Sequence, residues 1–169
     1  PNWRCIRRDA TTHNSQIRCR AAARPFDIQM TPHLADTPVL TTKRLTLRAP
    51  IPSDADAFVA FYQTDRAKYV GGPMISRQAW NFFGTEIGHW AMRGFGMFTV
   101  TAKDDPTPLG IVGHWFPQGW PETEIGWVLF DDTTEGTGVA FEAAKACVDH
   151  AWGPLGWTEC VSYIDHGND

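Results

Sequence analysis

The stretch ETEIGWVLFDDTTEGTGVAFEAAKACVDHAW, residues 122–152, decides the fold. Its first part is rich in aromatic and β-branched residues and stops at Asp131, which predicts a strand. Its last part repeats apolar residues at every fourth position, which predicts an amphipathic helix. These helix positions are Val139, Ala143, Cys147 and Ala151, with a neighbouring row at Ala140, Ala144, Val148 and Trp152.

The turn Gly136-Thr137-Gly138 joins this strand to this helix. The first N–H groups of a helix lack partners and carry partial positive charge, and glycine lets a phosphate approach the main chain. A tight turn also needs glycine for its backbone angles alone, so both interpretations stay open at this point. The G-x-G-x-x-G fingerprint and the G-x-x-x-x-G-K-[ST] loop are both absent from the stretch.

The runs EIGWVLF, EGTGVAFEAAKACVDHAW and SYIDHGN, in this order, resemble the GNAT superfamily of acetyl-coenzyme A-dependent N-acyltransferases. The likeness is greatest to the branch related to ribosomal-protein N-terminal acetyltransferases (RimJ/RimL type). That family's pyrophosphate signature is Q/R-x-x-G-x-G/A, and residues 135–140 (EGTGVA) fit both of its small positions but not its first. The segment TKRLTLRAPIPSDADAF also resembles the family's first strand and first helix.

This resemblance implies an α+β fold with a mixed, mostly antiparallel central sheet flanked by helices. We expect this domain over residues 38–169, lacking the family's last helix and closing strands and therefore truncated at the C-terminus, with an uncovered sheet edge. Along the chain the pattern predicts one strand over residues 40–48, a strand pair over 96–101 and 109–115, and a last strand over 158–165.

Two further helices are expected between the first strand and this strand pair. Ser53 resembles an N-cap with Asp56 as its capping-box partner. A second helix begins at Ser76, and its inward positions are predicted to be Trp80, Phe83, Ile87 and Trp90. The aromatic loop that holds Trp115, Phe116 and Trp120 is predicted either to pack in the core or to wall a substrate pocket.

The resemblance also implies a cofactor site for acetyl-CoA and no metal. The pyrophosphate is expected on the N–H groups of Gly136, Thr137, Gly138, Val139 and Ala140, and the pantetheine arm beside the backbone of Val128, Leu129 and Phe130. Asn168 matches the family's asparagine that hydrogen-bonds this arm.

Glu124, at the start of the central strand, is the expected general base. Glu122 and His114 are alternative bases. Glu124 could instead be a strand-end carboxylate in a salt bridge, without a catalytic role. Tyr163 is either a core residue or a catalytic one. Glu135 and Thr137 stand where the family commonly has basic or amide side chains, which lowers the positive charge beside the pyrophosphate.

The predicted function is therefore an acetyl-CoA-dependent N-acetyltransferase. It would move an acetyl group directly, in a ternary complex, to a primary amine on a protein N-terminus or a small molecule. The alternative is a catalytically weak GNAT-like protein that binds acyl-CoA or a partner, which the acidic Glu135 would favour.

Composition limits the remaining functions. Hydrophobic content is 43% and charged content 20%, and no apolar run is long enough for a membrane span. Residues 31–169 hold nine basic and 17 acidic residues, which argues against nucleic-acid binding and mildly favours cationic acceptors. The cysteines lack metal-ligand spacing and fit reduced thiols of a cytoplasmic protein. The oligomeric state stays open, a dimer being one option.

Residues 1–30 carry six arginines, no lysine and no periodicity. We expect a disordered N-terminal extension, with three origins to consider: a disordered arm, an organelle transit peptide, or sequence upstream of a start at Met30.

Overall fold

The computed structural model describes residues 4–7, 17–20 and 34–168, in two units that divide after Pro32. In the first unit, strand β1 (Arg4–Arg7) pairs antiparallel with β2 (Ile17–Arg20). The disordered extension over residues 1–30 stays a prediction, and most of it lies outside the described residues.

The second unit is built on a five-stranded sheet with antiparallel neighbours, which confirms the α+β class and the mostly antiparallel sheet that the resemblance implied. The strands are β3 (Leu40–Thr41), β4 (Leu45–Arg48), β5 (Met97–Ala102), β6 (Asp105–Trp115) and β7 (Glu124–Leu129), adjacent in that order. The prediction of one strand over residues 40–48 was wrong, because the segment is a hairpin. The Thr42 N–H bonds the Leu45 carbonyl at 3.0 Å, which reverses the chain between β3 and β4.

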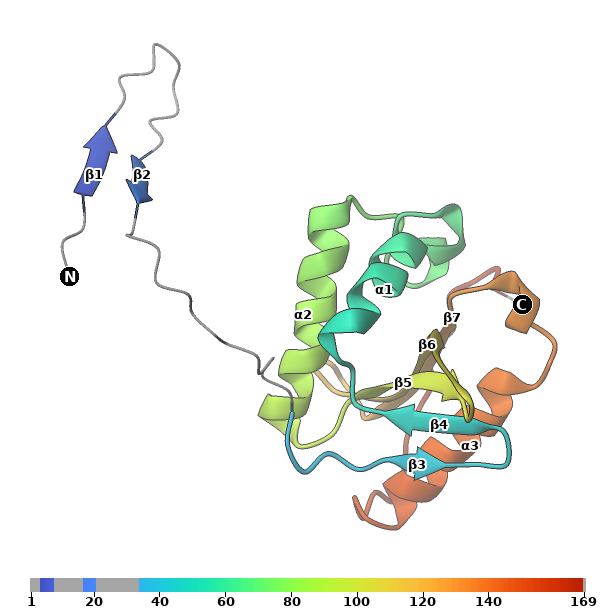
Figure 1. Cartoon of the computed structure of the whole chain (residues 1–169). Coiled ribbons are helices and arrows are strands. Elements are labelled where there is room, and N and C mark those ends of the chain that lie inside the picture. The colour runs from blue at the N-terminus through green and yellow to red at the C-terminus, as the bar shows by residue number, and fades with distance from the viewer. Residues whose placement is uncertain (1–3, 8–16, 21–33, 169) are drawn as a thin grey trace. The chain divides into compact units, whose positions relative to one another are not determined.

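Helices cover both faces of this sheet (Figure 1). Helices α1 (Ala55–Tyr62) and α2 (Ser76–Arg93) lie on one face, and α3 (Val139–Trp152) lies on the other. Strand side chains alternate between the layers: the core on the α1–α2 side includes Met97, Ile111 and Val128, and the core on the α3 side includes Phe98, Val112 and Ile125. The predicted inward row of α3 is correct, since Val139, Ala143, Cys147 and Ala151 are all buried.

Three local predictions were wrong. Ser53 lies in a short 3-10 turn (Pro52–Asp54), and Asp54, not Ser53, accepts the bond from the Ile51 N–H that closes this turn. Trp80 is 63% exposed, because the buried stripe of α2 runs one residue earlier through Ala79. The expected strand over residues 158–165 is reduced to a single parallel bridge between Glu124 and Val161.

None of the helices in the part of the chain that the structure describes has the length and apolar character that crossing a membrane requires.

A buried ion pair joins the sheet to the start of α1. The Asp54 carboxylate is 3% exposed and accepts two bonds from the Arg48 guanidinium, at 2.7 and 2.8 Å. The Thr99 hydroxyl and the Ile51 N–H donate to the same carboxylate. All these donors converge on one buried anion, so removing it leaves a cation and several polar groups without compensation.

We expect Asp54→Ala to lower the free energy of unfolding by about 3 kcal/mol, because it leaves the Arg48 guanidinium unpaired in a largely buried place. Urea unfolding followed by tryptophan fluorescence measures this change. The control is Asp56→Ala, an exposed acid in the first turn of α1 whose removal should cost less than about 1 kcal/mol. Equal losses in the two variants would contradict the importance of the buried pair.

Candidate active site

A cavity of about 500 Å³ lies between the α1–α2 layer, strand β7 and the C-terminal segment. Seven of its 20 lining residues are aromatic. Trp115 and Trp120 of the aromatic loop are among them, which supports the pocket-wall interpretation for these two residues. None of its described lining residues is Lys, Arg or His, whereas three are acidic. The aromatic members are Tyr62, Tyr69, Phe82, Trp115, Trp120, Trp127 and Tyr163, and the acidic members are Glu86, Glu124 and Asp165.

Strand β7 forms one wall and is an edge strand of the sheet. The Ile125 N–H bonds the Val161 carbonyl at 2.9 Å and the Ile125 carbonyl accepts from the Ser162 hydroxyl at 2.7 Å, so Ile125 points its main chain away from β6. Alternation along a strand puts the main-chain groups of Trp127 and Leu129 on the same outer side. Beyond the bridge at Val161, this outer edge is therefore open within the described part of the chain, apart from an Arg66 contact to the Leu129 carbonyl.

This geometry changes the predicted backbone donors on β7. The Phe130 N–H bonds the Leu109 carbonyl at 2.9 Å, so it faces β6. Val128 lies opposite Ile111 in the β6–β7 ladder and points its main chain the same way. Of the three residues predicted to pair with an extended ligand, only Leu129 offers its main chain at the outer edge.

Glu124 lies at the start of β7 and is 8% exposed. Its carboxylate accepts from the Trp120 indole N–H at 2.8 Å and from the Tyr163 main-chain N–H at 3.2 Å. Gly126, two residues along the strand, has no side chain to cover this carboxylate; a Cβ there would lie 3.9 Å from Glu124 Oε1 and 3.7 Å from Met97 Cε. Glu124 is therefore held in one orientation by neutral donors at the cavity wall.

Glu86, on α2, is a second carboxyl at this cavity, and the sequence interpretation missed it. It is 2% exposed, and its Oε2 atom has no hydrogen-bond partner among the described residues. Burial raises the pKa of Glu86 to about 8. A signal was present in the sequence: Glu86 falls on the same helix stripe as Ala79, Phe83 and Trp90, all of which are buried.

The glycine turn before α3 has the conformation that its sequence requires. Gly136 and Gly138 have φ angles of 70° and 81°, a region that favours glycine. Thr137 bonds within the turn, its hydroxyl donating to the Thr134 carbonyl at 2.5 Å and its N–H reaching the same carbonyl at 3.4 Å. The first unbonded N–H groups of α3 belong to the residues that follow this turn.

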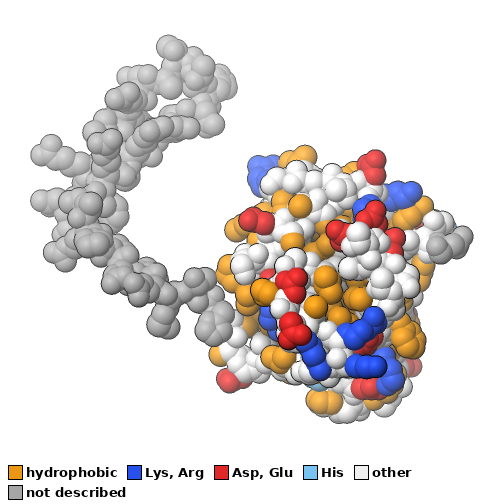
Figure 2. Space-filling model, turned by 45° about the vertical axis from the view of Figure 1, so that its right-hand side comes forward, with side chains coloured by type: hydrophobic (Ala, Val, Ile, Leu, Met, Phe, Trp, Pro, Cys, Tyr) orange, Lys and Arg blue, Asp and Glu red, His pale blue; other side chains and the backbone are white. Residues whose placement is uncertain are grey.

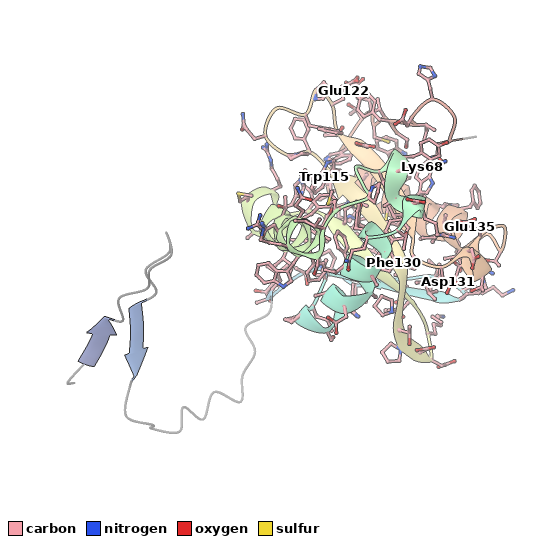
Figure 3. All side chains as sticks on the ribbon, turned by 90° about the horizontal axis from the view of Figure 1, so that it is seen from above. Lys68, Trp115, Glu122, Phe130, Asp131 and Glu135 are labelled. Atoms are coloured by element: carbon pink, nitrogen blue, oxygen red, sulfur yellow. The ribbon has the colours of Figure 1, made fainter. Side chains whose placement is uncertain are left out.

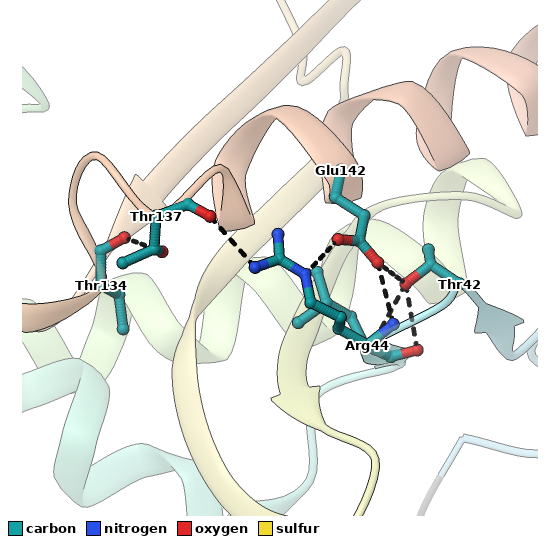
Figure 4. Close-up of polar contacts among 6 residues, drawn as sticks. Thr42, Arg44, Thr134, Thr137 and Glu142 are labelled. Atoms are coloured by element: carbon teal, nitrogen blue, oxygen red, sulfur yellow. Dashed lines mark hydrogen bonds and ion pairs between the residues drawn. The ribbon is translucent and has the colours of Figure 1, made fainter.

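Arginines neutralise the two acidic side chains beside the turn. Arg44 donates to the Glu142 carboxylate at 2.6 Å and to the Thr137 carbonyl at 3.0 Å (Figure 4). Hydrogen bonds from Thr42 and from Arg44 lower the pKa of Glu142 to about 2. Arg66, in the 3-10 helix Asp65–Tyr69, pairs with Glu135 at 2.6 Å.

The remaining sequence candidates lie in different places. Asn168 and Tyr163 line the cavity, and the Tyr163 hydroxyl donates to Glu122 at 2.7 Å. Glu122 lies at one end of the site, and Glu135 at the other (Figure 3). His114 is buried on the α3 side, where its Nε2 atom bonds the Cys147 carbonyl at 3.0 Å, so it is not a base for this cavity.

On the face drawn in Figure 2, apolar side chains gather in the middle and charged side chains of both signs surround them. Among the described residues, no group of His, Cys, Asp and Glu is arranged to hold a metal ion.

The fold and this edge-strand cavity define an acetyltransferase of the GNAT class, and comparison with known proteins agrees. The family model described as "Acetyltransferase (GNAT) domain" matches residues 44–169. An acetyltransferase from Agrobacterium tumefaciens is 32% identical with a TM-score of 0.74, over 82% of this chain and 81% of that chain. The chain therefore belongs to the GNAT acetyltransferase family, whose members take the acetyl group from acetyl-CoA.

More distant structures share the fold. The ribosomal-protein-S5-alanine acetyltransferase from Vibrio fischeri has a TM-score of 0.56 at 15% identity, over 76% of this chain and 75% of that chain. The RimL ribosomal L7/L12 alpha-N-protein acetyltransferase in complex with coenzyme A has a TM-score of 0.53 at 17% identity, over 68% and 67% of the two chains. A comparison with curated protein sequences found no match.

The buried carboxyl of Glu86 predicts a pH dependence of stability. Its pKa is raised from 4.5 to about 8, so between these values the folded protein keeps a proton that the unfolded chain releases. The free energy of unfolding should therefore fall as pH rises through this range, by up to about 1.4 kcal/mol per pH unit. Urea unfolding at a series of pH values measures it.

In Glu86→Gln this part of the pH dependence should disappear, whereas the exposed-site control Glu159→Gln should keep it. Parallel stability curves for the wild type and Glu86→Gln would show that Glu86 does not titrate in this way.

Proposed function

We propose that the protein is an acetyl-CoA-dependent N-acetyltransferase of the RimJ/RimL-type branch. It moves the acetyl group to a primary amine, on a protein N-terminus or a small molecule, by direct transfer in a ternary complex. The observation that carries the proposal is the open outer edge of β7 beside a cavity whose wall holds the Glu124 carboxylate. A cytoplasmic location is part of the same prediction.

The cofactor would bind at two places. Its pyrophosphate lies on the N–H groups at the start of α3, within residues 136–140, where the helix dipole adds positive charge. Its pantetheine arm lies along the outer edge of β7 and pairs with Trp127 and Leu129, as an added strand would. Asn168, at the cavity wall, supplies an amide to the same arm.

The chemistry then needs a base and an oxyanion donor. The amine nitrogen attacks the thioester carbonyl carbon and gives its proton to Glu124, and the C–S bond breaks to release the thiolate. An outward N–H of β7 stabilises the oxyanion formed on the carbonyl oxygen. Fixing both reactants in this geometry supplies about 7 kcal/mol or more of the barrier reduction.

The neutralised acids near the turn favour this enzyme over the alternative of a catalytically weak acyl-CoA-binding protein. Glu135 replaces a family Gln or Arg, but its charge is balanced by Arg66 and that of Glu142 by Arg44. A phosphate approaching the glycine turn therefore meets Glu135 and Glu142 as ion pairs, whereas Asp131 and Asp132, just before the turn, form no salt bridge among the described residues.

The role of Glu124 predicts the effect of Glu124→Gln. The amide keeps a hydrogen-bond acceptor for Trp120 but takes no proton, so kcat should fall about 100-fold or more while the Kd for acetyl-CoA stays unchanged. Thiol release with a panel of primary amines measures turnover, and calorimetry measures binding. Glu159→Gln, a matched change at an exposed site, should keep wild-type turnover.

Full turnover in Glu124→Gln would remove Glu124 as the base. Tight acetyl-CoA binding by the wild type with no thiol release for any amine would instead favour the binding-protein alternative.

Removing the charge of Glu135 should strengthen cofactor binding. Glu135→Gln releases Arg66 from its ion pair and takes one negative charge from the pyrophosphate site, so the Kd for acetyl-CoA should fall about threefold at low salt. The gain should shrink in 0.5 M salt, because the Debye length there is about 4 Å and the charge of residue 135 is screened from the pyrophosphate. Calorimetry at both salt concentrations tests this, and Glu159→Gln controls for overall charge. An unchanged Kd at low salt would contradict it.

A further inference from the structure

Glu86 is the one described carboxyl of the cavity that is deeply buried and lacks a partner for one of its oxygens. It belongs to α2, which lines the cavity together with β7. Its neighbours at the cavity include the rings of Tyr62, Phe82 and Trp115. Phe82 contacts both other rings edge to face, at 5.2 and 6.2 Å between centroids.

Two other carboxylates of this chain, in contrast, have several hydrogen-bond donors. Asp54 receives bonds from Arg48, Ile51 and Thr99, and Glu142 receives bonds from Thr42 and Arg44. A buried polar atom without a hydrogen bond costs free energy that folding must offset. Glu86 therefore has capacity for a donor that the protein itself does not supply.

The cavity wall limits what such a donor can be. A cation suits it, because the described lining residues include Glu86, Glu124 and Asp165 and no basic side chain. Aromatic faces attract an ammonium group and also bury apolar carbon. An ammonium has three N–H donors and a positive charge, which satisfies a buried carboxylate better than a neutral ligand does.

We propose that Glu86 binds the ammonium group of the acceptor and thereby selects primary amines carried on an apolar body. This inference rests on the proposed acetyltransferase function. It assigns Glu86 to binding of the protonated acceptor. The bound ammonium loses one proton to water to become the nucleophilic amine, and Glu124, whose two oxygens are held by Trp120 and Tyr163, takes the second proton when the amine attacks. Because burial raises the pKa of Glu86 to about 8, the free protein keeps this carboxyl protonated near neutral pH, and entry of the ammonium displaces that proton to solvent.

Direct binding of a matched ligand pair tests the proposal. Calorimetry on the full chain compares 2-phenylethylamine with 2-phenylethanol, which has the same carbon skeleton and no charge. The wild type should bind the amine at least about tenfold more tightly, and Glu86→Gln should reduce this ratio to about one. Glu86→Met, which fills the space without a polar group, should give the same loss.

Acetyl-CoA affinity, measured on each variant, reports that the cofactor half is folded, and Glu159→Gln should behave as the wild type with all ligands. The assignment of Glu86 is overturned if both Glu86 variants still prefer the amine. It is also overturned if the wild type binds acetyl-CoA normally but shows no preference for the amine. If the wild type fails to bind acetyl-CoA, the proposed function fails instead, while the amine comparison still tests the ammonium site.

The source of the ammonium is distinguished by a third ligand, the tripeptide Ala-Phe-Ala, and by its N-acetylated form. Tighter binding of the free tripeptide than of 2-phenylethylamine, lost in Glu86→Gln, supports a polypeptide N-terminus as the acceptor. Binding of the small amine alone, with the same loss, supports a small-molecule acceptor. The ammonium site is contradicted if the free and the acetylated tripeptides bind equally and if Glu86→Gln loses no affinity for the free tripeptide.

Discussion

The unpaired outer edge of β7 is the constraint on which the site depends. A strand edge with free N–H and C=O groups needs water, another strand or a ligand to complete it. Here the C-terminal segment pairs once, at Val161, and beyond that point Trp127 and Leu129 face outward. An extended molecule with its own amides satisfies such an edge, and the pantetheine arm of coenzyme A has two of them.

Arginine partners explain how this chain tolerates Glu135 and Glu142 beside the glycine turn, where we propose that the pyrophosphate binds. Arg44 comes from the β3–β4 hairpin and Arg66 from the segment after α1, both distant in sequence from the turn. Each is placed by tertiary structure against Glu142 or Glu135. The sequence motif shows only the charges of its own residues, whereas the electrostatic field at the turn also depends on charged residues that the fold places beside it.

The parts of the fold that the sequence predicted are those with a strong period. The α3 stripe, the β5–β6 pair and the antiparallel sheet follow from spacing and from the resemblance. Non-local effects account for the errors: the hairpin at Thr42 also depends on Glu142, about a hundred positions later, and the final strand depends on what pairs with β7. In the site, Glu124 was predicted from its place on the strand and does line the cavity. Glu86 was missed although it falls on the buried stripe of α2, because a glutamate on a helix is ordinarily exposed.

The two walls of the cavity therefore differ in whether main-chain or side-chain groups face the ligand. The β7 wall and the turn before α3 present mainly main-chain groups, whose positions follow from the fold. The α1–α2 wall acts through side chains such as Glu86 and Tyr62, which can differ between proteins that share the fold. The use of acetyl-CoA consequently follows from the family, whereas the choice of acceptor, under our proposal, depends on the buried carboxyl and the aromatic rings of this particular chain.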